Sequence, residues 1–332
     1  MTRGNGLSDA YTATLTRLKA QKGYKSTLGL KILMWVLYSE RPLKAEELRH
    51  ALGVEQGSTD IDHENIPALR TLLASSLGLV TVEASSSTMR LVHFTLQEQL
   101  LSDSTLFHSP HSAIAEVCLT YLNFESVRDL SPTLDSAPTS MPLLEYASYY
   151  WGEHTRKGKT ENVKILALRL LDKFDEHISA QLITLRYKRN TPASRSFDSK
   201  GPRGFTGLHG AAFLGIVEIL EALLEMKEWD VNARDNTLST PLMWAARKGH
   251  QGVVNLLLER RDINPDQANS VYGETALYLA GFYGHEGIVK MILERQDINP
   301  NQIPTGYPCT PLAIAACAGR EGISVRSRPG PP

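Results

Sequence analysis

Two short motifs in this 332-residue chain contain residues that could bind a ligand. The first, GEHTRKGKT at residues 152–160, holds the glycine, lysine and threonine of a phosphate-binding loop. Such a loop needs four residues between its glycines and a buried strand before it. Here five residues separate Gly152 from Gly158, and the preceding segment has a helical pattern. We therefore interpret this motif as a basic turn between helices and expect no nucleotide cofactor.

The second motif has the oxygen side chains of a calcium loop at Asp262, Asn264 and Asp266. A calcium loop also requires glycine at its sixth position and glutamate at its twelfth. Gln267 and Gly273 occupy those positions, and a near-identical phrase recurs at residues 297–301. A repeated structural element accounts for this pattern better, so we expect no metal.

Cysteine and histidine residues give no catalytic signature. Cys118, Cys309 and Cys317 lack the spacing of a zinc site or a disulfide framework, which fits a reducing cytosol. Cys118 lies on a helical apolar stripe, so we predict a core position for it. The ten histidines form neither an H-E-x-x-H motif nor a Ser-His-Asp signature. We expect no catalytic residues and no enzymatic activity.

Composition further limits the kind of partner. The net charge is −1, so no global charge attracts nucleic acid or an anionic membrane, and 42% of the residues are hydrophobic, as in globular proteins. The most apolar run, residues 28–38, is about half as long as a membrane span. The first residues lack the apolar core of a signal peptide. We expect a soluble, cytoplasmic protein.

Four threonines identify the elements that dominate the C-terminal part. Thr206, Thr240, Thr275 and Thr310 are spaced 34, 35 and 35 residues apart, and each begins a similar phrase. In the first three units an alanine-containing helix, a glycine and a second, more apolar helix follow. Since neither helix can bury its apolar face alone, the units must stack into an α-solenoid. His209, His250 and His285 fit this pattern as structural residues.

These phrases resemble ankyrin repeats, most completely in TPLMWAARKGHQGVVNLLLERRDIN at residues 240–264. About three and a half repeats are expected over residues 204–323, followed by a disordered tail at 324–332. Ile216 replaces the histidine of the pattern and Gly207 replaces its proline. The fourth repeat stops before its second helix, so we expect a truncated array.

By resemblance, the concave face of the repeats binds a protein partner of unknown identity. The residues that vary there include aromatic and basic side chains, which protein interfaces favour. The alternative is that some of the aromatic residues pack between repeats. The predicted partner-binding residues are Phe213, Leu214, Asn236, Met243, Trp244, Arg247, Lys248, Tyr272, Tyr278, Phe282, Tyr283 and Tyr307.

The N-terminal part predicts a mostly α-helical chain with one small α+β domain. Residues 1–26 contain an amphipathic helix that we interpret as the last helix of an upstream module. Residues 27–108 show three helices and then a hairpin, with strands expected at 79–84 and 89–94, which is the order of a winged helix. Residues 109–188 predict a helical connector, and residues 189–203 a linker.

Three segments of this domain resemble the winged-helix segment of fungal STAND proteins: RPLKAEELRHALGV, ALRTLLASSLGLV and RLVHFTLQEQL. In those proteins a NACHT module precedes the segment and ankyrin repeats often follow. A related domain is named after GPI inositol-deacylase, but the chain has no G-x-S-x-G motif of a hydrolase. The resemblance implies the C-terminal part of a NACHT–ankyrin protein, with the winged helix docked on a nucleotide-binding domain absent here.

The alternative is a transcriptional adaptor whose winged helix binds DNA. Residues 27–108 carry six lysines and arginines against ten acidic residues, a net charge of −4. Arg70 is the only cation on the candidate recognition helix, and Arg90 the only one in the hairpin. Because phosphate contacts dominate DNA affinity and require cations, docking on a neighbouring domain is favoured.

Overall fold

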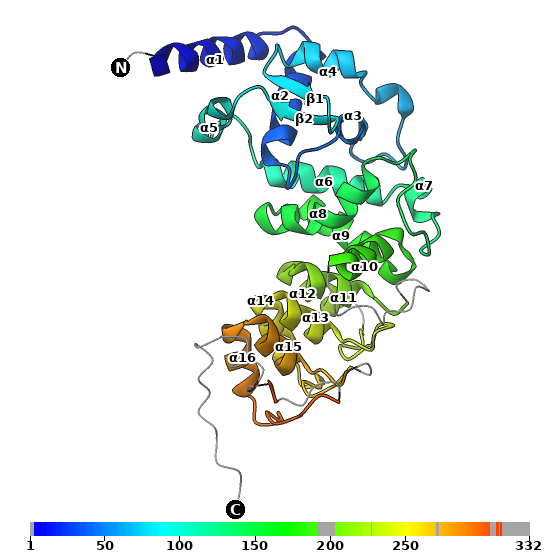
Figure 1. Ribbon diagram of the computed structural model, residues 1–332. Coiled ribbons are helices and arrows are strands. Elements are labelled where there is room, and N and C mark those ends of the chain that lie inside the picture. The colour runs from blue at the N-terminus through cyan, green and yellow to red at the C-terminus, as the bar shows by residue number, and fades with distance from the viewer. Residues whose placement is uncertain are drawn as a thin grey trace, which may run out of the picture. The chain divides into compact units, whose positions relative to one another are not determined.

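The computed structural model describes residues 3–190, 203–226, 228–269, 272–305, 310, 311 and 313 (Figure 1). They divide into two compact units. The N-terminal unit extends to Asp129 and includes Ser136–Leu166; the C-terminal unit contains Leu130–Asp135 and the described residues from Ala167 onward. The boundary falls inside α9 (Glu161–Leu171), so the helical segment 109–188 is shared between the units.

The N-terminal unit begins with a helical domain that contains one hairpin. Its elements are α1 (Arg3–Lys19), α2 (Tyr24–Tyr38), α3 (Ala45–Gly53), a 3₁₀ turn (His63–Asn65), α4 (Leu69–Ser75), β1 (Val80–Glu83), β2 (Thr88–Leu91) and α5 (Phe94–Ser102). The strands are antiparallel, with Val80 opposite Leu91. The other edge of β2 pairs with the chain before α3, where the Met89 amide donates to the Leu43 carbonyl at 2.8 Å. Three helices followed by a hairpin confirm the winged helix.

Both strands are shorter than the sequence suggests, four residues each instead of six, and α5 was not predicted. His93 ends the extended segment because its Nδ1 accepts a hydrogen bond from the Thr95 amide at 3.3 Å, which caps α5. Helix α5 in turn contacts α1, where Gln99 Nε2 donates to Thr12 Oγ1 at 2.8 Å. Leu18 of α1 is fully buried. Helix α1 therefore packs as part of this unit.

The rest of the N-terminal unit is built on the pair α6 (Pro110–Leu122) and α8 (Leu144–Lys157), with the short α7 (Glu125–Arg128). Cys118 is fully buried there, and burial raises the pKa of its thiol, as expected of a core cysteine. The motif at 152–160 is mostly helical rather than a turn, because α8 continues to Lys157. Its buried stripe extends through Trp151 and Thr155, which keeps the helix packed on α6.

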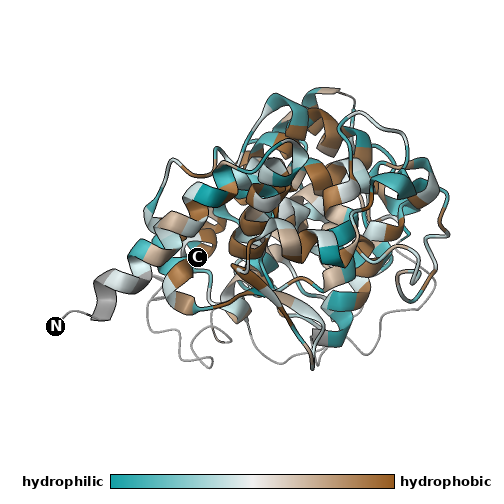
Figure 2. Cartoon of the chain, turned by 90° about the horizontal axis from the view of Figure 1, so that it is seen from above, coloured by the Kyte–Doolittle hydropathy of each residue, from teal (hydrophilic) through white to brown (hydrophobic). Residues whose placement is uncertain are grey.

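The C-terminal unit is a stack of helix pairs. A 3₁₀ turn (Phe174–Glu176) and α10 (Ile178–Asn190) precede α11 (Gly207–Leu214), α12 (Val217–Met226), α13 (Pro241–Lys248), α14 (Gln251–Leu258), α15 (Ala276–Tyr283) and α16 (Glu286–Leu293). Helices α11, α13 and α15 pack side by side as an inner row, and α12, α14 and α16 form an outer row (Figure 1). Hydrophobic stretches, brown in Figure 2, alternate with hydrophilic ones along the helices, and each helix of the two rows has buried hydrophobic residues, among them Leu208, Leu220, Leu242, Val253, Leu277 and Ile288. The mostly helical fold predicted from the sequence is confirmed.

The threonines begin the inner helices. The hydroxyls of Thr240, Thr275 and Thr310 each accept a hydrogen bond from the amide three residues later, at 3.2 to 3.3 Å. This satisfies amide groups that a helix N-terminus leaves without a helical partner. Thr206 differs, because its hydroxyl lies 2.9 Å from His209 Nδ1. The spacing of the threonines therefore marks the start of each repeat.

Histidines link each repeat to the one before it. His250 Nε2 lies 3.0 Å from the Phe213 carbonyl, and His285 Nε2 lies 3.2 Å from the Arg247 carbonyl. Since a carbonyl can only accept, Nε2 carries the proton in both rings. Ile216, which replaces the histidine in the first repeat, is buried. The structural role expected for these histidines is confirmed.

The calcium-like phrase makes the same kind of link on the loops. Asn232 Nδ2 donates to the Asp262 carbonyl at 2.6 Å, and Asn232 Oδ1 accepts from the Asn264 amide at 2.7 Å. One repeat further along, Asp266 accepts from the Asn299 amide at 2.7 Å. These contacts explain the recurrence of the phrase by repeat stacking.

His209 makes the stability of the repeats dependent on pH. The ring is fully buried, and its Nε2–H is shared by the carbonyls of Ala233 and Ser239, both at 3.1 Å. Burial lowers the pKa of His209, although the carboxylates of Asp235 and Asp175 oppose the shift. Because the unfolded chain then binds a proton more readily, stability is lost as pH falls below about 6.5.

We expect the free energy of unfolding of the C-terminal unit to decrease by at most about 1.4 kcal/mol per pH unit from this group. Urea titrations between pH 7.5 and 5 measure the slope. A His209→Gln variant should have a shallower slope than the wild type, whatever its stability at pH 7.5. Equal slopes would contradict a role for this ring.

Several sequence predictions lie outside the described residues, namely most of the linker, Tyr307, most of the fourth repeat and the tail at 324–332. Among the helices that the structure describes, none combines the length and apolarity needed to cross a bilayer.

Candidate functional site

Six of the predicted partner-binding residues lie at the ends of the inner helices, one pair for each of the first three repeats. In α13 and α15, Lys248 and Phe282 are exposed, the latter to 43%, and Arg247 and Tyr283 are half-buried. In α11, Phe213 is half-buried and its neighbour Leu214 is buried.

An aromatic cluster packs around Phe213 and Trp244. The Trp244 ring lies 5.4 Å from the ring of Phe213 and 5.8 Å from that of Phe205, measured between centroids. Tyr187 of α10 lies edge-on to Trp244 at 5.1 Å and to Phe213 at 6.0 Å. Aromatic pairs at these distances and angles are favourable beyond their burial. The cluster therefore fixes α10 and the first two inner helices to one another.

The guanidinium of Arg247 is held within the protein. It pairs with Glu274 at 3.1 Å and lies 5.1 Å from the Trp244 ring centroid, and Nη1 donates to Tyr187 Oη at 3.3 Å. The side chains of both ion-pair partners are only about a tenth exposed, at 9% and 12%. Arg247 is therefore held in place by these contacts. Lys248 is exposed, and its Nζ lies 4.6 Å from the Phe213 ring centroid.

Three more of the predicted contact residues are in the core. Met243 and Tyr278 are 1% exposed and Trp244 is 2% exposed. Trp244 Nε1 donates to Asp235 Oδ2 at 2.8 Å. The burial of Trp244 and Tyr278 agrees with the alternative that some of the aromatic residues pack between repeats. On the loops, Asn236 is exposed and Tyr272 is half-buried.

The structure adds residues that sequence reasoning did not select. Tyr187 and Glu274 both contact Arg247, yet they lie 60 and 27 residues from it in the chain. Tyr187 lies before the repeats, and Glu274, the residue directly before Thr275, was not among the predicted contacts. No local signal indicates this contact, because it depends on how α10 packs on the inner row.

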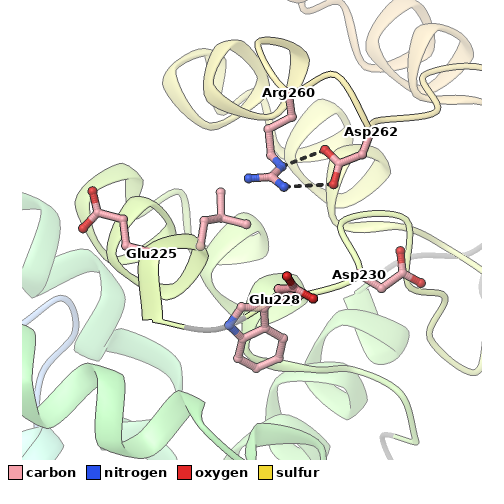
Figure 3. Close-up of a pocket in the computed structure, with 7 residues that line it drawn as sticks. Glu225, Glu228, Asp230, Arg260 and Asp262 are labelled. Carbon is pink, nitrogen blue, oxygen red and sulfur yellow. Dashed lines mark hydrogen bonds and ion pairs between the residues drawn. The ribbon is translucent and has the colours of Figure 1, made fainter.

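A hollow lies at the C-terminal ends of the outer helices α12 and α14 (Figure 3). It has a volume of about 630 Å³ and is lined by Leu224, Glu225, Glu228, Trp229, Asp230, Arg260 and Asp262. Arg260 and Asp262 form a bidentate pair with both hydrogen bonds at 2.9 Å. The other carboxylates give the hollow a negative potential, which is complementary to a basic side chain.

Comparisons with known proteins agree with both parts of the fold. A model of ankyrin repeats, in three copies, matches residues 179–269 and 208–303, and a model of the GPI inositol-deacylase winged helix domain matches residues 16–114. The protein thus combines ankyrin repeats with a winged helix.

Among curated proteins, the chain is similar to human ankyrin repeat domain-containing protein 7, with 31% identity over 81 residues. The match covers 24% of this chain and 32% of that protein, so the chain spans about a third of the length of this relative. The similarity supports a general role of the repeats in protein–protein interaction.

Proposed function

We propose that this chain is a non-enzymatic interaction module of a STAND-type signalling protein, whose ankyrin repeats bind a protein partner. The exposed Lys248 and Phe282, together with the half-buried Tyr283, carry this proposal. They lie at the ends of the adjacent inner helices α13 and α15; Lys248 lies over the Phe213 ring of the aromatic cluster, and the Phe282 and Tyr283 rings lie 5.1 Å apart. A central aromatic anchor beside a cation is typical of binding hot spots.

The winged helix contributes a docking surface for a neighbouring nucleotide-binding domain. Val92, Phe94 and Leu101 are 44%, 66% and 51% exposed, which is unusual for such apolar side chains in one short segment. The hairpin offers little to DNA, since Arg90 pairs with Glu83 at 3.0 Å. A coding sequence for a P-loop module at the 5′ end of the transcript would support this architecture; an unrelated upstream sequence would oppose it.

The binding surface is tested by a double variant, Lys248→Glu with Phe282→Ala. We expect at least tenfold weaker affinity for a partner captured by the wild-type chain, since both a cation and an aromatic anchor are removed. Affinity is measured by calorimetry with the purified partner. The stability of the repeats should change little, because both side chains are exposed.

The matched control changes the outer row in the same chemical way. Lys290 of α16 and Met226 of α12 are both exposed. A Lys290→Glu, Met226→Ala variant should keep wild-type affinity. Equal losses in both variants, or no loss in the first, would show that the partner binds elsewhere.

A further inference from the structure

Three side chains that could ligate a metal meet in the N-terminal unit, whereas the proposed binding surface belongs to the C-terminal unit. Glu40 follows α2, His111 is in the first turn of α6, and His154 is in α8. One ligand atom of each lies within 4.8 Å of the others. His154 is fully buried, whereas Glu40 and His111 are half-buried, so an ion could reach the cluster from their side.

The imidazole rings of His111 and His154 face each other with their Nδ1 atoms. His111 Nδ1 lies 2.9 Å from His154 Nδ1. At this distance one proton must be shared between the two nitrogens, because two N–H groups would repel. A metal ion can take the place of that proton when both Nδ1 atoms present lone pairs.

The surroundings of His154 favour that arrangement. Its Nε2 lies 2.9 Å from Tyr146 Oη, so an Nε2–H can donate to the phenol oxygen while Nδ1 remains free to ligate. Metal-binding histidines usually donate their second N–H in this way. Burial lowers the pKa of His154 and that of His111, which favours the neutral form that ligates metals.

We propose that Glu40, His111 and His154 bind one divalent transition-metal ion, with Zn²⁺ the preferred ion, which ties the segment after α2 to α6 and α8. Two imidazoles and a carboxylate suit Zn²⁺ rather than Mg²⁺ or Ca²⁺. Lys157 Nζ holds one carboxylate oxygen of Glu40 at 2.6 Å, which leaves the other for the ion. Tetrahedral Zn²⁺ places two nitrogens about 3.3 Å apart, so the rings must separate by a few tenths of an ångström.

The test uses the full chain, purified without a histidine tag and freed of metal by chelation. Calorimetry with Zn²⁺ and the visible absorption of added Co²⁺ should both give one equivalent bound, and Mg²⁺ should give none. Zn²⁺ should also raise the melting temperature of the chain by mass action.

The substituted residues are His111 and Glu40, because both are half-buried. A loss of metal binding in these variants can then be distinguished from a loss of core packing. His111→Gln and Glu40→Gln should each weaken Zn²⁺ binding at least tenfold and abolish the melting shift, with circular dichroism verifying that each variant is folded. His108→Gln is the matched control, since His108 is exposed three residues from His111. The proposal is overturned if Zn²⁺ and Co²⁺ show no saturable binding, or if His111→Gln binds as tightly as the control.

Discussion

Replacing Trp244 with alanine is expected to lower the free energy of unfolding of the ankyrin repeats by about 3–5 kcal/mol. The indole is 2% exposed and packs against Tyr187, Phe205 and Phe213. Its removal leaves a cavity among these rings, which the surrounding helices can only partly close. It also removes the donor to Asp235 Oδ2, a carboxylate that is only 3% exposed.

Urea denaturation followed by far-ultraviolet circular dichroism measures this loss. Phe282→Ala is the control, because Phe282 is an aromatic residue of the next inner helix with 43% exposure. The control should cost about 1 kcal/mol or less. If the two substitutions cost the same, Trp244 would not be the core residue that its burial indicates.

Trp244 also shows why the repeats could be predicted while the exposure of the predicted binding residues could not. The start of a repeat follows from local chemistry. In the second and third repeats the threonine hydroxyl accepts a hydrogen bond from the amide three residues later, which caps the helix. Exposure at the end of the helix depends instead on distant elements. Tyr187 of α10 covers Trp244, which is buried, and Glu274 pairs with the half-buried Arg247, so its guanidinium is held by the protein.

In the N-terminal unit, too, local elements could be predicted from the sequence and long-range contacts could not. The order of helices and strands was sufficient to predict the winged helix. Helix α5 was missed because a cap formed by His93 is an uncommon helix-start signal. His111 and His154 lie 43 residues apart, a separation that matches no metal-binding motif. Only the packing of α6 on α8 brings their rings together, and a one-dimensional pattern does not contain that packing.

The second large effect is expected at Gly249, where alanine should destabilise the repeats by about 2–3 kcal/mol. Gly249 ends α13 with φ at 81°, a conformation that costs other residues about 1–2 kcal/mol. A Cβ atom there would lie 2.6 Å from Cε1 and 2.8 Å from Nδ1 of His285. The ring must then move, which weakens its 3.2 Å hydrogen bond to the Arg247 carbonyl, a bond that contributes about 1 kcal/mol.

A double-mutant cycle separates the two causes. In a His285→Ala background the colliding ring is absent, so Gly249→Ala should cost only the backbone strain of about 1–2 kcal/mol. Gly57→Ala is the control for strain alone, since Gly57 has φ at 80° and no atom within 4 Å of the added Cβ. It should show no coupling to His285.

If the free-energy costs of Gly249→Ala and His285→Ala are additive, the missing side chain at Gly249 is not what makes room for the His285 ring. Coupling would show that the glycine ending one inner helix and the histidine of the next repeat act as a unit. Gly215 and His250 have the same arrangement, with the added Cβ against Nδ1 of the ring, so the same coupling is expected between the first and second repeats. A substitution in one repeat would then weaken its contact with the next, which is how a linear array transmits a local defect.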